Sequence, residues 1–163
     1  MKINIVILSF LMASVSTFAQ VSYGDRSFGD YNIKINVSTE NDSIFLNLIL
    51  TSWKYKITET PRLLLKLMDD SVISLEGKLI NSYYENDGGI VIGNMIESSS
   101  EYITISKFPI SKIDIEKFIK GIKKLRLNTT PKYHEKNWSR DKIGKKLLKR
   151  YKECGSTSFE DNF

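Results

Sequence analysis

The chain has 163 residues and a formal net charge of +5 at pH 7, and 41% of its residues are hydrophobic while 26% are charged. This composition is that of an ordinary globular protein and excludes a disordered chain. The single cysteine, Cys154, excludes an internal disulfide, and the single histidine, His134, excludes a metal site built from several histidines.

The first 19 residues have the order of a secretory signal peptide. Lys2 supplies positive charge, residues 3–13 are almost wholly apolar, and small or polar residues follow up to Ala19. We expect cleavage after Ala19 and an exported protein of a bacterial type, periplasmic or extracellular. The apolar run is shorter than the roughly 20 residues of a membrane-spanning helix, so we expect no transmembrane segment after cleavage. No cysteine follows the run, so a lipoprotein is not expected.

Residues 20–30 are expected to be a flexible N-terminus of the mature chain. From residue 31 onward, apolar and polar side chains alternate, which is typical of strands with one face on a core. The expected strands are residues 31–36, 44–57, 62–68, 72–75, 78–84, 90–96 and 101–108. Asp87-Gly88-Gly89 is a strong hairpin signal and predicts a tight turn. These short strands predict a mainly β or α+β fold, an antiparallel β-sandwich-like domain.

The period changes after Pro109. Ser111 followed by Asp114 resembles a capping box and predicts one short helix that ends at Gly121. A strand is expected over residues 122–127, and an irregular loop over residues 128–138.

A C-terminal amphipathic helix is expected over about residues 140–153, because apolar residues recur there at three- and four-residue spacing. Ser139 is a candidate cap, and Cys154-Gly155 suits the helix end. The sequence therefore predicts a single β-rich domain over residues 31–154, followed by a loose tail over residues 155–163.

Positive charge is concentrated in the C-terminal third. Residues 111–153 hold 15 Lys and Arg against 5 Asp and Glu, whereas residues 20–110 hold 8 against 12. Such a surface attracts nucleic acid, anionic lipid or an acidic partner, although Lys and Arg also simply coat surface helices. The candidate binding residues for an anionic partner or envelope component are Lys123, Lys124, Lys145, Lys146, Lys149 and Arg150.

No catalytic, metal or cofactor motif occurs in the chain, so we expect no catalytic residues, no metal ligands and no cofactor. A Cys154–His134 nucleophilic pair is conceivable, but a buried thiol and a loop histidine are the favoured interpretation. Asp69-Asp70 is expected to form a plain turn rather than a calcium site. The aromatic residues Trp53, Tyr55, Tyr83 and Tyr84 either form a sugar- or peptide-binding surface or fill the core and its rim.

Three segments resemble uncharacterised small exported proteins of Bacteroidetes-type bacteria. They are Arg62 to Leu75, Phe108 to Leu127 and the closing Lys152-Glu153-Cys154, and the resemblance covers roughly residues 43–154. The chain departs from that group at Asp69-Asp70-Ser71, where Asp-Gly is more usual. The resemblance implies export and no particular activity or site.

The leading hypothesis is a non-catalytic binding or interaction module of the cell envelope or exterior. The alternatives are a structural or accessory factor of the envelope, and a hydrolase of an extracellular polymer that uses two of the scattered carboxylates. A basic helix lying flat on the sheet, together with the absence of a cleft, favours the binding module. A groove lined by Trp53, Tyr83 or Tyr84 with two facing carboxylates favours the hydrolase.

Overall fold

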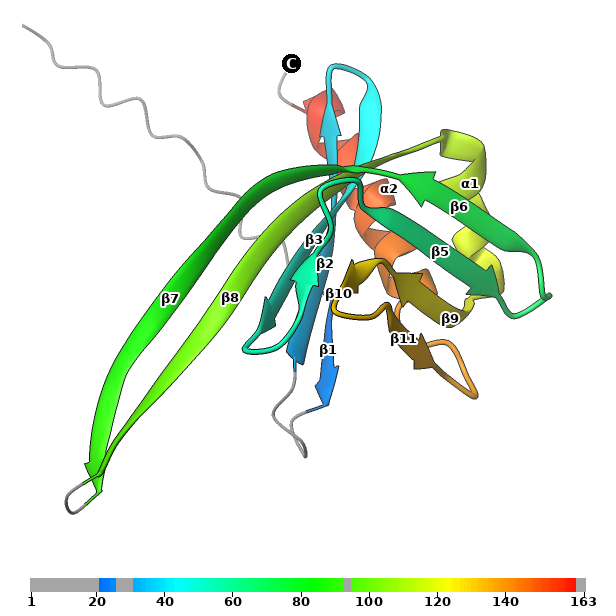
Figure 1. The fold of residues 1–163 in the computed structure, drawn as a ribbon. Coiled ribbons are helices and arrows are strands. Elements are labelled where there is room, and N and C mark those ends of the chain that lie inside the picture. Colours follow the sequence, from blue (N-terminus) through cyan, green and yellow to red (C-terminus); the bar gives the residue numbers. More distant parts are fainter. Residues whose placement is uncertain (1–20, 26–30, 93–94, 161–163) are drawn as a thin grey trace, which may run out of the picture.

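The computed structural model describes residues 21–25, 31–92 and 95–160 (Figure 1). The expected signal peptide, residues 1–19, lies outside the described residues. Within them the chain forms mostly antiparallel β-structure with two short helices and the longer helix α2, which confirms the expected fold class. No helix among the described residues combines the length and the apolar character needed to cross a bilayer.

The larger sheet has the strand order β1-β2-β3-β8-β7, and every neighbouring pair is antiparallel. Its strands are β1 (Val21–Asp25), β2 (Tyr31–Glu40), β3 (Ser43–Ser52), β7 (Lys78–Ile92) and β8 (Met95–Ile110). Because Val21–Asp25 pair along β2, the prediction of a flexible segment over residues 20–30 is wrong for these five residues.

The smaller sheet has the order β11-β9-β5-β6, built from β5 (Arg62–Leu67), β6 (Val72–Glu76), β9 (Ile122–Leu127) and β11 (His134–Asn137). β4 (Lys56–Ile57) pairs separately with β10 (Thr129–Thr130). The prediction of an irregular loop over residues 128–138 is therefore wrong for residues 129–130 and 134–137, which form β10 and β11. The expected strand 44–57 is also interrupted, because the Ser52 hydroxyl accepts hydrogen bonds from the N–H groups of Lys54 and Tyr55 and bends the chain there.

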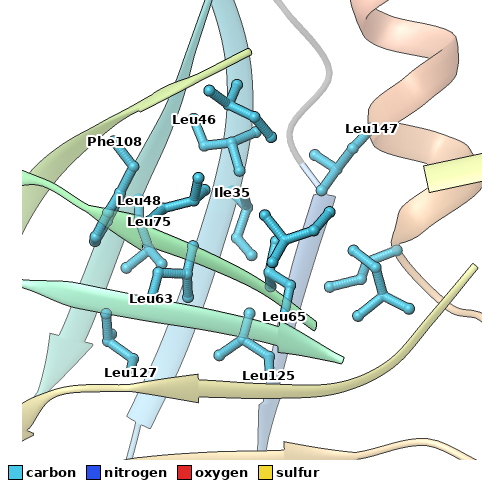
Figure 2. Packing of buried hydrophobic residues seen from close by; sticks show 14 of the residues in the cluster. Ile35, Leu46, Leu48, Leu63, Leu65, Leu75, Phe108, Leu125, Leu127 and Leu147 are labelled. Atoms are coloured by element: carbon cyan, nitrogen blue, oxygen red, sulfur yellow. The ribbon is translucent and has the colours of Figure 1, made fainter. Parts of the chain in front are cut away.

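The core lies between the two sheets, in a sandwich-like arrangement (Figure 2). Buried and more exposed residues alternate along β2, β3, β5 and β6, and the apolar side chains from both sheets meet in the core. Those labelled in the figure are Ile35, Leu46, Leu48, Leu63, Leu65, Leu75, Phe108, Leu125 and Leu127, with Leu147 of α2 beside them. Each such side chain contributes about 1.5–3 kcal/mol by leaving water, so the core stabilises the chain without cross-links.

The predicted short helix is present as α1 (Lys112–Glu116) and the 3-10 turn η1 (Lys117–Lys120). The Ser111 hydroxyl accepts a hydrogen bond from the Asp114 N–H at 3.1 Å, which confirms the capping interaction. Gly121 ends this segment with φ of +82°, a conformation that glycine adopts without a Cβ penalty.

Helix α2 (Gly144–Glu160) begins later and ends later than predicted. The start is displaced because Asp141, rather than Ser139, caps the helix. The helix continues through Gly155, so the predicted end at Cys154-Gly155 and the loose tail are wrong up to Glu160, and residues 161–163 lie outside the described residues.

Strands β7 and β8 form a long two-stranded arm that extends away from the two sheets (Figure 1). The predicted tight turn at Asp87-Gly88-Gly89 is wrong, because β7 runs straight through these residues. The ladder instead shifts its register between Asp87 and Ile90 and continues to the pair Ile92–Met95. Glycine pairs inside a strand are commonly accommodated as such a bulge.

Candidate functional site

Helix α2 is positioned by one carboxylate at its start. Asp141 accepts hydrogen bonds from the N–H groups of Gly144 at 2.7 Å and Lys145 at 2.8 Å, and also from the N–H of Ile122 at the start of β9 at 3.0 Å. Burial acts to raise the pKa of Asp141, but the surrounding backbone N–H donors outweigh it and hold the pKa below its usual value. The same side chain therefore caps α2 and ties it to the smaller sheet.

The apolar face of α2 lies against the body of the protein. Leu147 and Leu148 are buried, as is Ile143 just before the helix, and α2 packs against β2 and η1. Further along the helix, the Cys154 thiol lies 3.9 Å from the Val37 carbonyl oxygen of β2, and burial raises the pKa of this thiol. The helix thus lies flat on the β-structure.

The opposite face of α2 carries lysines at helical spacing. We define the lysine stripe as Lys142, just before α2, and Lys145, Lys146, Lys149 and Lys152 on the helix, all of which are exposed. Residues three and four apart share one face of a helix, so Lys145, Lys149 and Lys152 form one row, with Lys146 beside it. Lys149 lies 3.8 Å from Glu153, whereas no described acidic side chain forms an ion pair with Lys142, Lys145, Lys146 or Lys152.

The other predicted cations have carboxylate partners. Lys123 pairs with Asp70 at 3.1 Å, Lys124 pairs with Glu135 at 2.6 Å, and Arg150 pairs with Glu153 at 2.6 Å. The hydrogen bonds from Lys124 and Arg126 lower the pKa of Glu135 to about 2, so Glu135 stays ionised. The structure therefore concentrates uncompensated charge on α2 rather than on β9. Lys142 and Lys152 extend the predicted set, and helical spacing alone was sufficient to include Lys152 on α2.

The Asp69-Asp70 turn is held by lysines. Asp69 accepts hydrogen bonds from both the N–H and the hydroxyl of Ser71, and Lys120 lowers the pKa of Asp69 to about 2. Asp70 adopts φ of +66° and pairs with Lys66 at 2.8 Å. Among the described residues, no group of three or more His, Cys, Asp or Glu side chains gathers where a metal ion would need them.

His134 lies far from Cys154. Its ring meets the Tyr31 ring edge-on with 4.1 Å between centroids, whereas Cys154 lies against Val37. Tyr31 and Val37 are six positions apart on β2, or roughly 20 Å at the rise of a strand. The conceivable nucleophilic pair is therefore not formed, and His134 belongs to strand β11 rather than to a loop.

A pocket of about 360 Å³ lies beside His134, lined by Tyr31, Tyr55, Lys132, Tyr133 and Glu135. Burial lowers the pKa of His134 to about 4, and Lys136 adds to this effect. At neutral pH His134 is therefore uncharged and Glu135 is ionised.

The low pKa of His134 predicts a stability change in mild acid. The unfolded chain has the ordinary pKa of 6.5 and binds the proton first as the pH falls, while the folded chain resists it down to about 4. Stability is thus fully present above pH 6.5 and is lost as the pH falls toward 4. We expect the free energy of unfolding, measured with urea, to fall by about 2 kcal/mol between pH ~7.5 and pH ~5.

The variant His134→Gln provides the control for this pH dependence. Asp and Glu titrate mainly below pH ~5, so the variant is expected to show a flat profile across the same interval. A variant that keeps the full acid-induced loss would show that another group is responsible.

The aromatic residues at the base of the arm are divided between core and surface. Tyr55 is buried, whereas Trp53, Tyr83 and Tyr84 are 52%, 44% and 54% exposed. The Tyr84 and Tyr102 rings lie 4.9 Å apart between centroids, with the Lys56 ammonium 3.6 Å from the Tyr102 centroid. Core packing therefore explains Tyr55 and leaves the other three on the surface.

A comparison with family models, with curated proteins and with solved structures finds no match to this chain. Its function is therefore inferred from the surface chemistry of the described residues.

Proposed function

We propose that the protein is an exported, non-catalytic binding module that engages an anionic partner through the lysine stripe of α2. The observation that carries the proposal is the set of exposed lysines, of which only Lys149 has its ammonium group within 4 Å of a described carboxylate. By contrast, the cations of β9 and of the Asp69-Asp70 turn are in ion pairs. Uncompensated charge of one sign attracts an oppositely charged partner over a distance.

The partner chemistry follows from the orientation of α2. A helix that inserts into a membrane surface buries its apolar face in the lipid, but the apolar face of α2 is already buried through Leu147 and Leu148. The exposed face offers four ammonium groups, those of Lys145, Lys146, Lys149 and Lys152, along about two turns of helix. This arrangement suits a linear polymer with repeated negative charges, such as an acidic polysaccharide of the cell envelope or exterior.

The proposed location rests on the sequence. The order of charged, apolar and small residues in the first 19 positions is that of a secretory signal. The resemblance of residues 43–154 to small exported proteins of Bacteroidetes-type bacteria supports the same location.

The proposal is tested by the triple variant Lys145→Glu, Lys146→Glu, Lys149→Glu. We expect its affinity for heparin, a sulfated polysaccharide, to fall roughly tenfold at near-physiological salt, because exposed charges typically contribute 0.2–1 kcal/mol each after screening. The measurement is the dissociation constant by titration, supported by retention on an anionic matrix. Circular dichroism checks that the helix is intact.

The matched control is Lys34→Glu, Lys112→Glu, Lys132→Glu, which changes the net charge by the same amount. These lysines are exposed and belong to β2, α1 and the segment between β10 and β11. The control is expected to bind heparin nearly as the unaltered protein does. If both triple variants lose heparin affinity equally, net charge alone explains the binding. If the α2 variant binds heparin as tightly as the unaltered protein, its lysines serve only to keep the surface soluble. Either result overturns the proposal.

A further inference from the structure

A groove of about 530 Å³ opens where β6 passes into β7. Its walls come from three parts of the chain, namely Phe45 of β3, Lys107 and Pro109 of β8, and the segment from Glu76 to Ile80. Phe45, Lys107 and Pro109 alternate with the buried Leu46, Phe108 and Ile110. The groove therefore lies on the face of the larger sheet that points away from the core.

The shape of the groove depends on Gly77 and on a bulge beside it. A Cβ on Gly77 would lie 2.6 Å from the Phe108 ring, so only glycine lets the chain pass this close to β8. The β7–β8 ladder then shifts between Leu79 and Asn81. Ile80 falls in this bulge and is 57% exposed. The outcome is an apolar wall formed by Ile80, Phe45 and Pro109.

The charges at the rim are unevenly compensated. Lys78 and Lys107 are directly opposite each other on β7 and β8, an arrangement of like charges that is unfavourable in a sheet. Lys107 is paired with Glu40, and its ammonium also lies 4.1 Å from the Phe45 ring centroid.

The other rim charges are Glu76 and Lys78. Glu76 lies opposite Arg62 across β5 and β6, where the Arg62 Nε donates a hydrogen bond to the Ser74 hydroxyl at 3.2 Å. No described carboxylate forms an ion pair with Lys78. The rim therefore presents the Lys78 ammonium group beside an apolar wall.

We propose that this groove binds a monoanionic amphiphile, an acyl chain that ends in a carboxylate. The chain would lie on Phe45, Ile80 and Pro109, and the carboxylate would pair with Lys78. The volume falls in the range of small-molecule sites, which are mostly apolar with a few placed polar groups. The Lys78 ammonium group matches a single negative charge, whereas a phosphate carries about −1.5 to −2. The groove shares no residue with the lysine stripe, so this inference goes beyond the proposed function.

The test uses decanoate below its micellar concentration, titrated by calorimetry, with decanol and decyltrimethylammonium as the neutral and cationic analogues. We expect saturable decanoate binding and at least tenfold weaker binding of both analogues. Lys78→Glu is expected to weaken decanoate binding at least tenfold. Ile80→Asp, at an exposed position that tolerates substitution, is expected to abolish saturable binding because it places a negative charge in the apolar wall.

The matched control is Lys34→Glu, which makes the same charge change on the outward side of β2 in the same sheet. It is expected to bind decanoate as the unaltered protein does, and so is the triple variant of α2. The inference is overturned if the unaltered protein shows no saturable decanoate binding, if Lys78→Glu binds normally, or if the cationic analogue binds equally well. Loss of decanoate binding in the α2 variant would show that decanoate binds at the lysine stripe rather than in the groove, and this result would also overturn the inference.

Discussion

Replacing Asp141 by alanine is expected to lower the free energy of unfolding by about 3 kcal/mol. Loss of a helix cap costs about 1 kcal/mol, and leaving buried N–H donors without acceptors costs about 1–3 kcal/mol more. Asp141 serves both roles, because its carboxylate caps α2 at Gly144 and Lys145 and accepts the N–H of Ile122 in β9. Urea unfolding followed by circular dichroism measures the loss.

Ser139→Ala is the matched control, since Ser139 is exposed and is the cap that the sequence favours. We expect this change to alter stability by less than about 0.5 kcal/mol, as is usual at the surface. Asp141→Asn, which keeps one acceptor oxygen, is expected to fall between the two. Equal losses of unfolding free energy for Ser139→Ala and Asp141→Ala would contradict capping by Asp141. They would favour instead the predicted helix start at residue 140.

Gly77→Val is expected to lower the free energy of unfolding by about 3 kcal/mol, near the upper end for overpacking. The Cβ would lie 2.6 Å from the Phe108 ring and 2.8 Å from the Lys107 carbonyl oxygen. The ring has little room because Phe108 is fully buried, and the carbonyl belongs to the backbone of β8. Relief therefore requires β6 and β7 to move away from β8. Urea unfolding measures the loss.

Ser82→Val is the control for the valine side chain itself. Ser82 is exposed on the same strand, so the same residue type is added to β7 without a close contact. It is expected to leave stability within about 0.5 kcal/mol. A Gly77→Val variant as stable as the unaltered protein would show that the corner is not close-packed against Phe108.

The fold could be predicted wherever one face of a strand is buried. The alternation of apolar and polar residues predicts β2, β3, β5 and β6 to within a few residues, because every second side chain of these strands is buried in the core. The strands β10 and β11 were missed because they are short and polar and are held by β4 and β9, which are distant in sequence. The arm was misjudged because Gly88-Gly89 has the composition of a turn, and only the continuous β7–β8 ladder shows it to be a bulge.

For the candidate site too, the sequence predicts features that depend on neighbouring residues but not those that depend on contacts between distant segments. Helical spacing was enough to place Lys145, Lys146 and Lys149 on one exposed face. The sequence could not show that Lys123 and Lys124 are paired, because their carboxylate partners come from other strands or turns. The groove at Gly77 could not be predicted either, since β3, β7 and β8 become neighbours only in the folded sheet.

The most direct test of the proposed function is a solution NMR titration of the protein with heparin oligosaccharides. The proposal predicts saturable chemical-shift changes that concentrate on residues 142–152, with ammonium resonances of Lys145, Lys146 and Lys149 among the most affected. Largest changes on Lys123 and Lys124 of β9, or no saturable change anywhere on the described residues, would contradict it.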